Sequence, residues 1–419
     1  MQSRIMAPVL CAASVALLAA PAIRALDLAS GDWKFSVDGN INVHYIASSC
    51  QSAASAKAIA TVGGACVGDQ SGSNVSSVSN GLLPAALTFA VATTQNGIDL
   101  GAHFGLYPGI ATNDGGSPNL EINGGNNLPL GTTGLDVRQV YLTFGNKDMG
   151  TFALGRNFGL FGFDAIINDM TLPGVGVAGS MATRAPANTS LGSIGFGYIY
   201  CDTLAQMNYT TPDFSGLNLT LGIFEPVNPL VEAAGAVTNK STPGFHGKLA
   251  YSTSFDAAKL YLSGTFISQK QGYVAGSTTG SYNSTGYDAT AKLDVAGFSL
   301  LGSYYHGDGM GTTALFTLAD SAAGVARTSD GYLVQATYTV KAVKFGVNYG
   351  VSQLDFANGA DQLALPNLLK RNSKVTGGVY YSLTKNLTVL GEYSSAQTQA
   401  HNGDENKSNS FNIGAFLAF

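Results

Sequence analysis

Apolar and polar residues alternate one by one along residues 33–45, broken only by Gly39. Because successive side chains of a β-strand point to opposite faces, this segment predicts a strand with one apolar face, aromatic near both ends, and one polar face. A soluble sheet could show the same pattern, but a polar face of this length fits lipid outside and water inside. The residues expected to line the water-filled side are Lys34, Asp38, Asn40 and His44.

The alternation recurs along the chain, and its connections differ in length. Short turns are expected near residues 93–97, 145–150, 212–216, 254–257, 295–297, 341–342 and 384–386. Long loops rich in Gly, Ser, Thr and Asn are expected near residues 47–81, 107–134, 158–200, 225–244, 269–283, 307–329, 353–372 and 397–408. This arrangement joins about 16 strands, with both chain ends on the short-turn side. Short turns, long loops and an even strand number are typical of outer-membrane β-barrels.

The chain also ends as a strand, in which Phe411, Ile413, Ala415, Leu417 and Phe419 alternate with Asn412, Gly414, Phe416 and Ala418. A last strand in this position can pair with the first and so remove both open edges, which lipid does not tolerate. The last strand of a soluble sandwich is the alternative. We therefore predict an all-β fold for residues 26–419, a transmembrane antiparallel up-and-down β-barrel.

Composition supports this fold. Charged residues make up 11% of the chain, against about 25% in soluble proteins. Past residue 25 no apolar run approaches the ~18 residues that a membrane helix needs. A chain with so little charge and no spanning helix can place its apolar groups by alternating them along strands.

Residues 1–25 predict a signal peptide. Arg4 precedes an apolar stretch over residues 7–20, and small residues follow, so that cleavage after Ala25 or Ala22 fits. A retained anchor helix is the alternative. Removal of this segment takes away two of the 21 basic residues and none of the 26 acidic ones, which leaves a net charge of −7. No basic cluster indicates a nucleic-acid partner.

Three cysteines remain after the predicted cleavage. In an oxidising periplasm, Cys50 and Cys66 could form a disulfide that closes one loop, and Cys201 would then be a buried free thiol. No pair of cysteines has the spacing of a zinc site.

Two segments carry a resemblance to a known family. Residues 138–145, a short turn and residues 150–156 read Arg-Gln-Val-Tyr-Leu-Thr-Phe-Gly and Gly-Thr-Phe-Ala-Leu-Gly-Arg. This hairpin resembles the one before the third loop of Gram-negative porins, residues 209–216 resemble the porin strand that follows that loop, and Phe419 is similar to the porins' terminal signal for the barrel-assembly machinery. The resemblance implies a homotrimer of 16-stranded barrels, surrounded by outer-membrane lipid and lipopolysaccharide, whose third loop folds inward.

Here the third loop would be residues 158–200. Its first part, residues 158–170, is unusually apolar for an external loop and would be a sticky patch on the cell surface. Infolding against the barrel wall would bury it. The Pro-Glu-Phe motif of enteric porins is absent, so the charge pattern of their constriction does not carry over.

In such a channel the functional residues select solutes. Opposed charges across a narrow, water-filled waist orient polar solutes, and an excess of one sign selects ions. The candidate acids on the inward loop are Asp164 and Asp169. The candidate bases are Arg138 and Arg156, where the resemblance implies arginines along the wall beside that loop, and, as a further choice, Arg184 on the second half of the loop. Alternatively, Arg156 and Asp164 only pin the loop to the wall.

Strict alternation around Arg138 has a further consequence. It would place Val140, Leu142 and Phe144 inside the barrel, covered by the apolar loop. The small residues Thr151, Ala153 and Gly155 would then face outward, where they suit a tight contact between subunits.

Catalysis has little support. The five histidines are scattered without metal-ligand spacing, and no serine, histidine and acid fall on neighbouring strands. Gly63 and Gly64 precede no helix that would make a phosphate cradle. We therefore expect a porin without cofactor or metal, for passive diffusion of small hydrophilic solutes and ions. The alternatives are a substrate-specific channel and a non-conducting barrel that serves as an adhesin or structural anchor.

Overall fold

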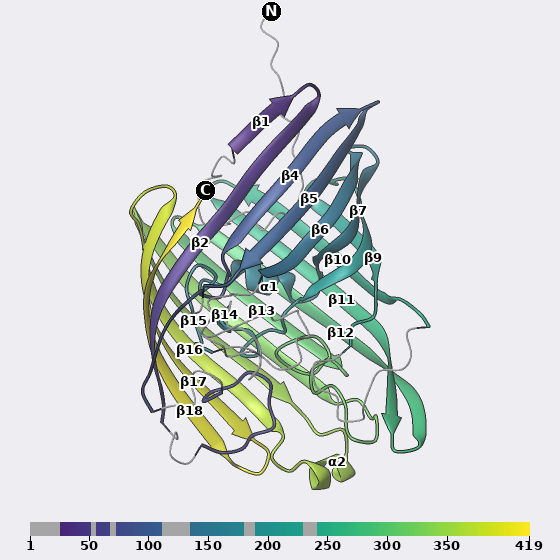
Figure 1. Cartoon of the computed structure of the whole chain (residues 1–419), viewed down its shortest axis with the longest axis vertical. Helices are drawn as coiled ribbons and strands as arrows, with labels where there is room; N and C mark the ends of the chain where they lie inside the picture. The colour runs from purple at the N-terminus through teal and green to yellow at the C-terminus, as the bar shows by residue number, and fades with distance from the viewer. Residues whose placement is uncertain (1–25, 52–55, 68–72, 111–134, 180–188, 229–240) are drawn as a thin grey trace, which may run out of the picture.

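The chain forms one closed antiparallel sheet, which the computed structural model describes for residues 26–51, 56–67, 73–110, 135–179, 189–228 and 241–419 (Figure 1). The strands are β1 (Leu26–Ser30), β2 (Trp33–Cys50), β3 (Val75–Ser79), β4 (Ala86–Gln95), β5 (Ile98–Pro108), β6 (Leu135–Asn146), β7 (Gly150–Phe158), β8 (Thr203–Thr210), β9 (Leu217–Phe224), β10 (Gly244–Phe255), β11 (Ala258–Ala275), β12 (Thr278–Val295), β13 (Phe298–Asp308), β14 (Thr328–Val340), β15 (Val343–Leu354), β16 (Leu369–Ser382), β17 (Leu387–Ala400) and β18 (Glu405–Ala418). The helices are α1 (Phe163–Asn168) and α2 (Gly359–Ala364). Neither of these helices in the described residues is long and apolar enough to cross a membrane.

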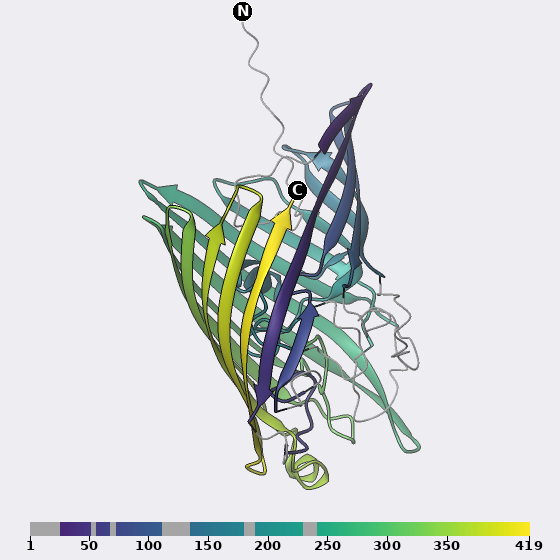
Figure 2. The same cartoon turned by 60° about the vertical axis from the view of Figure 1, so that its left-hand side comes forward.

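These 18 strands fill 16 positions in the wall, because two positions are each filled by two strands in line. β3 and β4 pair with the same edge of β2, at residues 44–48 and 34–40. β1 and β18 pair with its other edge, at residues 33–37 and 40–50. Figure 2 shows β18 beside β2, where the sheet closes. The prediction of a closed 16-stranded antiparallel barrel is confirmed.

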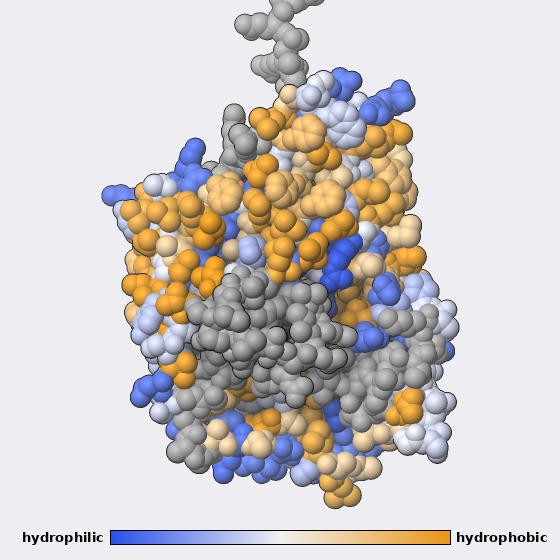
Figure 3. All heavy atoms as spheres, viewed as in Figure 1, coloured by the Kyte–Doolittle hydropathy of each residue, from blue (hydrophilic) through white to orange (hydrophobic). Residues whose placement is uncertain are grey.

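The wall is apolar outside and polar inside, as the alternation predicts. On β2, Ile41 is 51% exposed, whereas the next residue, Asn42, is 1% exposed. Large apolar side chains stand outward around the wall, among them Phe104, Leu142, Met207, Leu249, Leu300, Val347 and Ile413. Figure 3 shows an apolar band across one face of the barrel. A band of this kind is the surface that a membrane barrel presents to lipid.

All seven predicted short turns connect strands where expected. The turn at Asn96 and Gly97, for example, has φ angles of 52° and 77°, which asparagine and glycine adopt readily. Two of the predicted loops are wrong. Residues 269–283 mostly continue β11 and β12, and residues 397–408 mostly continue β17 and β18. Their polar composition suggested loops, but a strand that projects into water is polar on both faces and still pairs its backbone.

The seam of the barrel leaves no room for a side chain at Gly39. Its N–H donates to the carbonyl oxygen of Phe419 at 2.8 Å, and the N–H of Phe419 donates back to its carbonyl at 2.9 Å. A Cβ atom at this position would lie 2.5 Å from the Ala86 carbonyl oxygen and 2.7 Å from the Phe419 ring. The glycine that interrupts the alternation of β2 is therefore needed where the sheet closes.

We predict that Gly39→Val destabilises the barrel by about 1–3 kcal/mol, the usual cost of overpacking. The temperature at which the folded form is lost in heat-modifiable gel electrophoresis should fall. Gly377→Val is the matched control, because a Cβ at Gly377 meets nothing within 4 Å. Equal unfolding temperatures for the two variants would contradict this account of the seam.

Candidate functional site

The described residues between β7 and β8, 159–179 and 189–202, turn into the barrel and are called the third loop from here on. It includes α1, which both views place within the ring of strands (Figures 1 and 2). Phe161, Ala165 and Met170 are each at most 3% exposed. The apolar residues that predicted an infolded loop therefore lie inside the barrel.

Two carboxylates of the wall accept hydrogen bonds from backbone N–H groups of the third loop. Asp288 on β12 accepts from Gly162 at 2.6 Å, just before α1. Glu392 on β17 accepts from Val175 and Gly176, each at 2.8 Å. Both carboxylates are buried, so these charge-assisted bonds hold the loop backbone at two widely separated strands.

Two carboxylates of the third loop make the reverse contacts with the wall. Asp164 lies 3.2 Å from the Lys248 Nζ on β10 and accepts from the Tyr261 hydroxyl at 2.8 Å. Asp169 accepts from the Asn348 side-chain amide on β15 at 3.1 Å. Asp164 is 2% exposed and Asp169 3% exposed. The contacts of Asp164 fit the alternative of an anchor, and a role of either residue as a selecting charge stays a prediction.

Arg138 faces inward, but the strict alternation assumed around it is wrong. Gly105 on β5 pairs with Gln139 and the next residue, Leu106, pairs with Val137, so that Arg138 is an extra residue in a β-bulge. Arg138 and Gln139 are consequently both buried. The bulge reverses the faces beyond it, and Val140 stands outward at 39% exposure instead of lining the lumen.

Because of this bulge, the side chains beyond it on β6 and those paired with them on β7 point to the opposite face from the predicted one. Leu142 is outward at 46% exposure, and Phe144 shares its face. The expected outward small residues point inward instead, because directly paired residues share a face of the sheet. The pairs are Tyr141 with Gly155, Thr143 with Ala153, and Gly145 with Thr151. These three residues of β7 therefore face the lumen and cannot form a subunit contact.

Arg156 lies on the outer face, because it pairs with the outward residues Val140 and Ala205. Its proposed place across the waist from the third loop is therefore wrong. Arg138 instead donates to Asp136 at 3.1 Å and to the Tyr200 hydroxyl at 3.4 Å, within the contact between wall and loop.

The other residues predicted to line the pore lie at different positions in the wall. Asn40 and His44 point inward and are buried, Asp38 is half-buried, and Lys34 is exposed near the short-turn end of β2. Arg184 lies outside the described residues.

Several side chains of the candidate site were not singled out from the sequence: Lys248, Asp288, Lys344 and Glu392. Each stands on the polar face of a strand whose apolar face is recognisable, as Asp288 does between Tyr287 and Ala289. Alternation could have shown that they point inward. It could not show which of them meet the third loop, because those contacts join residues more than 80 positions apart in sequence.

Lys344 on β15 presents a positive charge to the lumen. It is half-buried, pairs with Tyr380 of β16, and holds its Nζ 4.5 Å from the centre of the Tyr380 ring. Lys292 on β12 faces inward as well and lies 3.7 Å from Asp294. The inner surface on this side thus offers cations beside aromatic rings and carboxylates.

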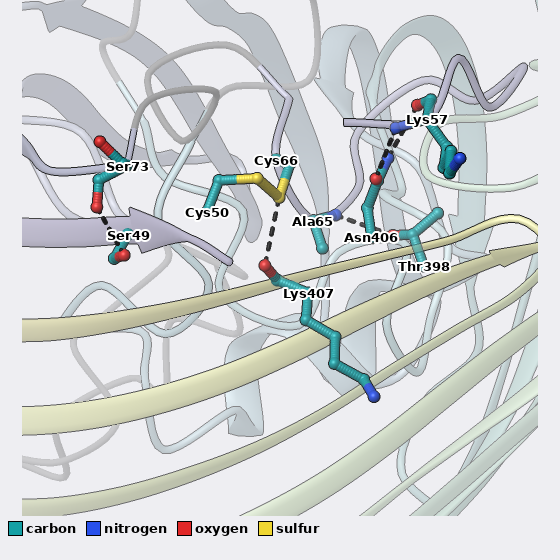
Figure 4. Close-up of a disulfide and its surroundings, with 9 residues drawn as sticks. All are labelled: Ser49, Cys50, Lys57, Ala65, Cys66, Ser73, Thr398, Asn406 and Lys407. Atoms are coloured by element: carbon teal, nitrogen blue, oxygen red, sulfur yellow. Dashed lines mark hydrogen bonds between the residues drawn. A yellow bond between two sulfur atoms is a disulfide. The ribbon is translucent and has the colours of Figure 1, made fainter. Parts of the chain in front are cut away.

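Two more loops enter the mouth of the barrel. Residues 309–327, called the sixth loop, place Met310 and Phe316 fully inside, packed in one cluster with Phe161 and Ile199 of the third loop. Residues 56–67, called the first loop, carry Cys66, which forms a disulfide with Cys50 at the end of β2 (Figure 4). Described parts of three loops therefore occupy the lumen.

A buried ion pair ties the sixth loop to α2. Arg327 donates to both carboxylate oxygens of Asp361, at 2.8 Å and 2.7 Å, and both side chains are 1% exposed. Burial alone would raise the pKa of Asp361, but hydrogen bonds from Arg327 and the Ala357 N–H hold it below its usual range. The external end of the channel is thereby braced.

No catalytic constellation stands out in the described residues. Cys201 is free and fully buried, and burial raises the pKa of its thiol well above the usual value, so it is a poor nucleophile. Nor does this part of the chain bring together three His, Cys, Asp or Glu residues that could hold a metal ion.

The barrel resembles several solved structures. It matches the outer membrane channel DcaP of Acinetobacter baumannii with a TM-score of 0.66 and 13% identity, covering 93% of this chain and 99% of that one. It matches Salmonella typhi OmpF, solved in complex with daunomycin, with a TM-score of 0.56 and 13% identity over 94% and 100% of the two chains. It matches Pseudomonas putida OprB with a TM-score of 0.53 and 12% identity over 92% and 94%. At such identities these likenesses show the fold alone.

Sequence comparison supplies the family. No curated protein matches the chain significantly. A profile of the Gram-negative porins, however, matches residues 7–401, nearly the whole chain. This chain therefore belongs to the Gram-negative porin family, and its barrel is an outer-membrane channel for passive diffusion.

Proposed function

We propose that the channel passes small hydrophilic solutes and ions by diffusion through a narrow waist formed by the third loop, without catalysis and without a cofactor. The observation that carries this proposal is the anchoring of the loop to β10, β12, β15 and β17 by carboxylate contacts. A loop held on so many strands keeps a constant opening. Polar inward side chains keep that opening wet.

Lys344 is our candidate for a selecting charge at this waist. Its inward position and partial exposure make its charge available to passing ions. Asp164 and Asp169 contribute acidic charge from the loop, reduced by their own contacts with the wall. A channel selective for one class of solute is the second candidate, favoured by the entry of three loops into the lumen. A non-conducting adhesin or anchor is the third.

We also propose that the barrels assemble as a homotrimer through the face that includes β7. Arg156 stands outward there, beside Val140 and Ala205. An arginine that faces lipid costs about 2–4 kcal/mol at the centre of the bilayer. A neighbouring subunit over this face would remove that cost.

The rest of the apolar band is proposed to contact outer-membrane lipid, including lipopolysaccharide at the external leaflet. Phe419 is 40% exposed, and its backbone closes the seam with Gly39. We keep it as the proposed recognition signal for the barrel-assembly machinery.

The first prediction from the proposed function tests conduction and selection together. Refolded protein should give stepwise currents in planar bilayers, and Lys344→Gln should shift the reversal potential across a salt gradient towards cation preference, because a positive inward charge is lost. Lys341→Gln, in the exposed turn before β15, should leave the potential unchanged. If folded protein gave no current in the bilayers, the channel would be excluded and the adhesin or structural anchor would remain as the hypothesis. An unmoved potential for Lys344→Gln would remove that residue from the waist.

The second prediction concerns the rigidity of the third loop. Glu392→Ala leaves the Val175 and Gly176 N–H groups and the Tyr380 hydroxyl without an acceptor, at about 1–3 kcal/mol for each buried group. The open-channel current should become noisier, with transitions between levels. Glu392→Gln keeps an acceptor oxygen and should be milder, and Glu405→Ala at the external end of β18 is the control. A steady current in Glu392→Ala would show that the loop does not depend on this contact.

The third prediction concerns assembly. Arg156→Glu should weaken the trimer, observed as a lower mass in mild detergent by light scattering. Arg371→Glu is the control, since Arg371 is an outward arginine on β16 that donates to the Tyr349 hydroxyl. Wild-type protein that is monomeric under these conditions would exclude the homotrimer.

A further inference from the structure

The first loop bends into the barrel and meets the wall opposite the third loop's entrance. The Lys57 N–H donates to the Asn406 side chain of β18, and the Ala65 N–H donates to the Thr398 hydroxyl of β17 at 2.7 Å. The side-chain amide of Asn372, on β16, donates to the Gly63 carbonyl at 3.3 Å. The three wall side chains are inward and at most 4% exposed. Residues 57–66 therefore lie inside the mouth of the barrel.

The same segment touches the other two inward loops. The Thr313 hydroxyl of the sixth loop donates to the Val62 carbonyl. Ala65 is fully buried in one apolar cluster with Leu191 and Ile194 of the third loop. The first loop thus fills the space between the wall formed by β16 to β18 and the other two loops, above the waist proposed for the third loop.

Two consecutive glycines allow this close fit. Gly63 has a φ of +72°, and a Cβ added there would lie 3.0 Å from the Thr313 methyl group. A Cβ at Gly64 would lie 2.9 Å from the Thr398 hydroxyl oxygen. The sequence indicated no phosphate-binding role for Gly63 and Gly64. Their close approach to the sixth loop and to the wall explains why both positions are glycine.

The disulfide restrains the segment at its C-terminal end. Cys50 is the last residue of β2, and Cys66 follows Ala65 directly. The bonded cysteines are 16 positions apart in sequence, so that Gly63 to Cys66 cannot move far from the rim of β2. Figure 4 shows the bond above the edge of β18, close to the hydrogen bonds of Ala65 and Lys57.

We propose that residues 57–66, held inward by the Cys50–Cys66 disulfide, form a second constriction that sets the upper size of solutes entering the channel from outside. This inference rests on the proposed diffusion channel and adds to it a separate element that determines size selection. The third loop sets the waist from four of the surrounding strands, whereas the first loop covers the mouth on the side of β16 to β18.

The experiment compares reduced and oxidised channels after folding, so it does not depend on refolding a variant. Wild-type protein is inserted in bilayers, and dithiothreitol is added on the external side. Alkylation and mass spectrometry then verify that both thiols are free. In parallel, liposome swelling measures the uptake of sugars of increasing size, before and after reduction.

Reduction should raise the single-channel conductance and shift the size limit to larger sugars. The variant Cys50→Ser/Cys66→Ser should show the raised conductance from the start and should not respond to dithiothreitol. It also excludes an effect of reductant on the buried Cys201. Unchanged conductance and an unchanged size limit in fully reduced wild-type channels would overturn the proposal while leaving the channel itself established. Absence of any current in the oxidised protein would instead reject the diffusion channel.

Discussion

Backbone hydrogen bonding is the constraint from which this structure follows. In the hydrocarbon of a bilayer each unpaired N–H or C=O costs several kcal/mol, and no water is there to accept or donate. A sheet meets this demand only when it has no free edge. β18 and β1 together cover one edge of β2, and β3 and β4 together cover the other. Closure produces the lumen, and the lumen gives the chain a transport route.

A closed lumen of 16 strands is too wide for side chains to fill, so its interior has to be narrowed by the chain itself. Here the inward loops narrow the lumen, and polar and charged side chains of the wall bind the backbone of these loops. Asp288 and Glu392 replace water at amide groups of the third loop that would otherwise lie unpaired in a buried position. The third loop therefore meets the wall in two ways: Phe161 packs with inward wall side chains such as Tyr305 of β13 and with the sixth loop, and the loop backbone donates to carboxylates of the wall.

Much of the barrel could be predicted from alternation and turns, because both are local. The alternation within residues 33–45 is enough to predict the outward and the inward face of that strand. The sequence Gln95-Asn96-Gly97 is enough to predict the hairpin turn. The bulge at Arg138 could not be predicted, since one extra residue reverses the faces of the rest of β6 without any signal in composition. The contacts that anchor the third loop to the wall could not be predicted from the sequence either. Asp164 and Lys248 are 84 positions apart, and only the closed ring brings their strands around the loop.

The anchoring of the third loop also limits how porins of this type can diverge or be recombined. Its contacts reach from Lys248 on β10 to Glu392 on β17, so the loop and half of the wall form one matched set. A loop of another backbone shape, grafted from a relative, would not donate N–H groups to Asp288 and Glu392. Two buried carboxylates would then lack hydrogen-bond donors. Inheritance of a new selectivity is therefore easier through single inward side chains than through exchange of the loop as a cassette.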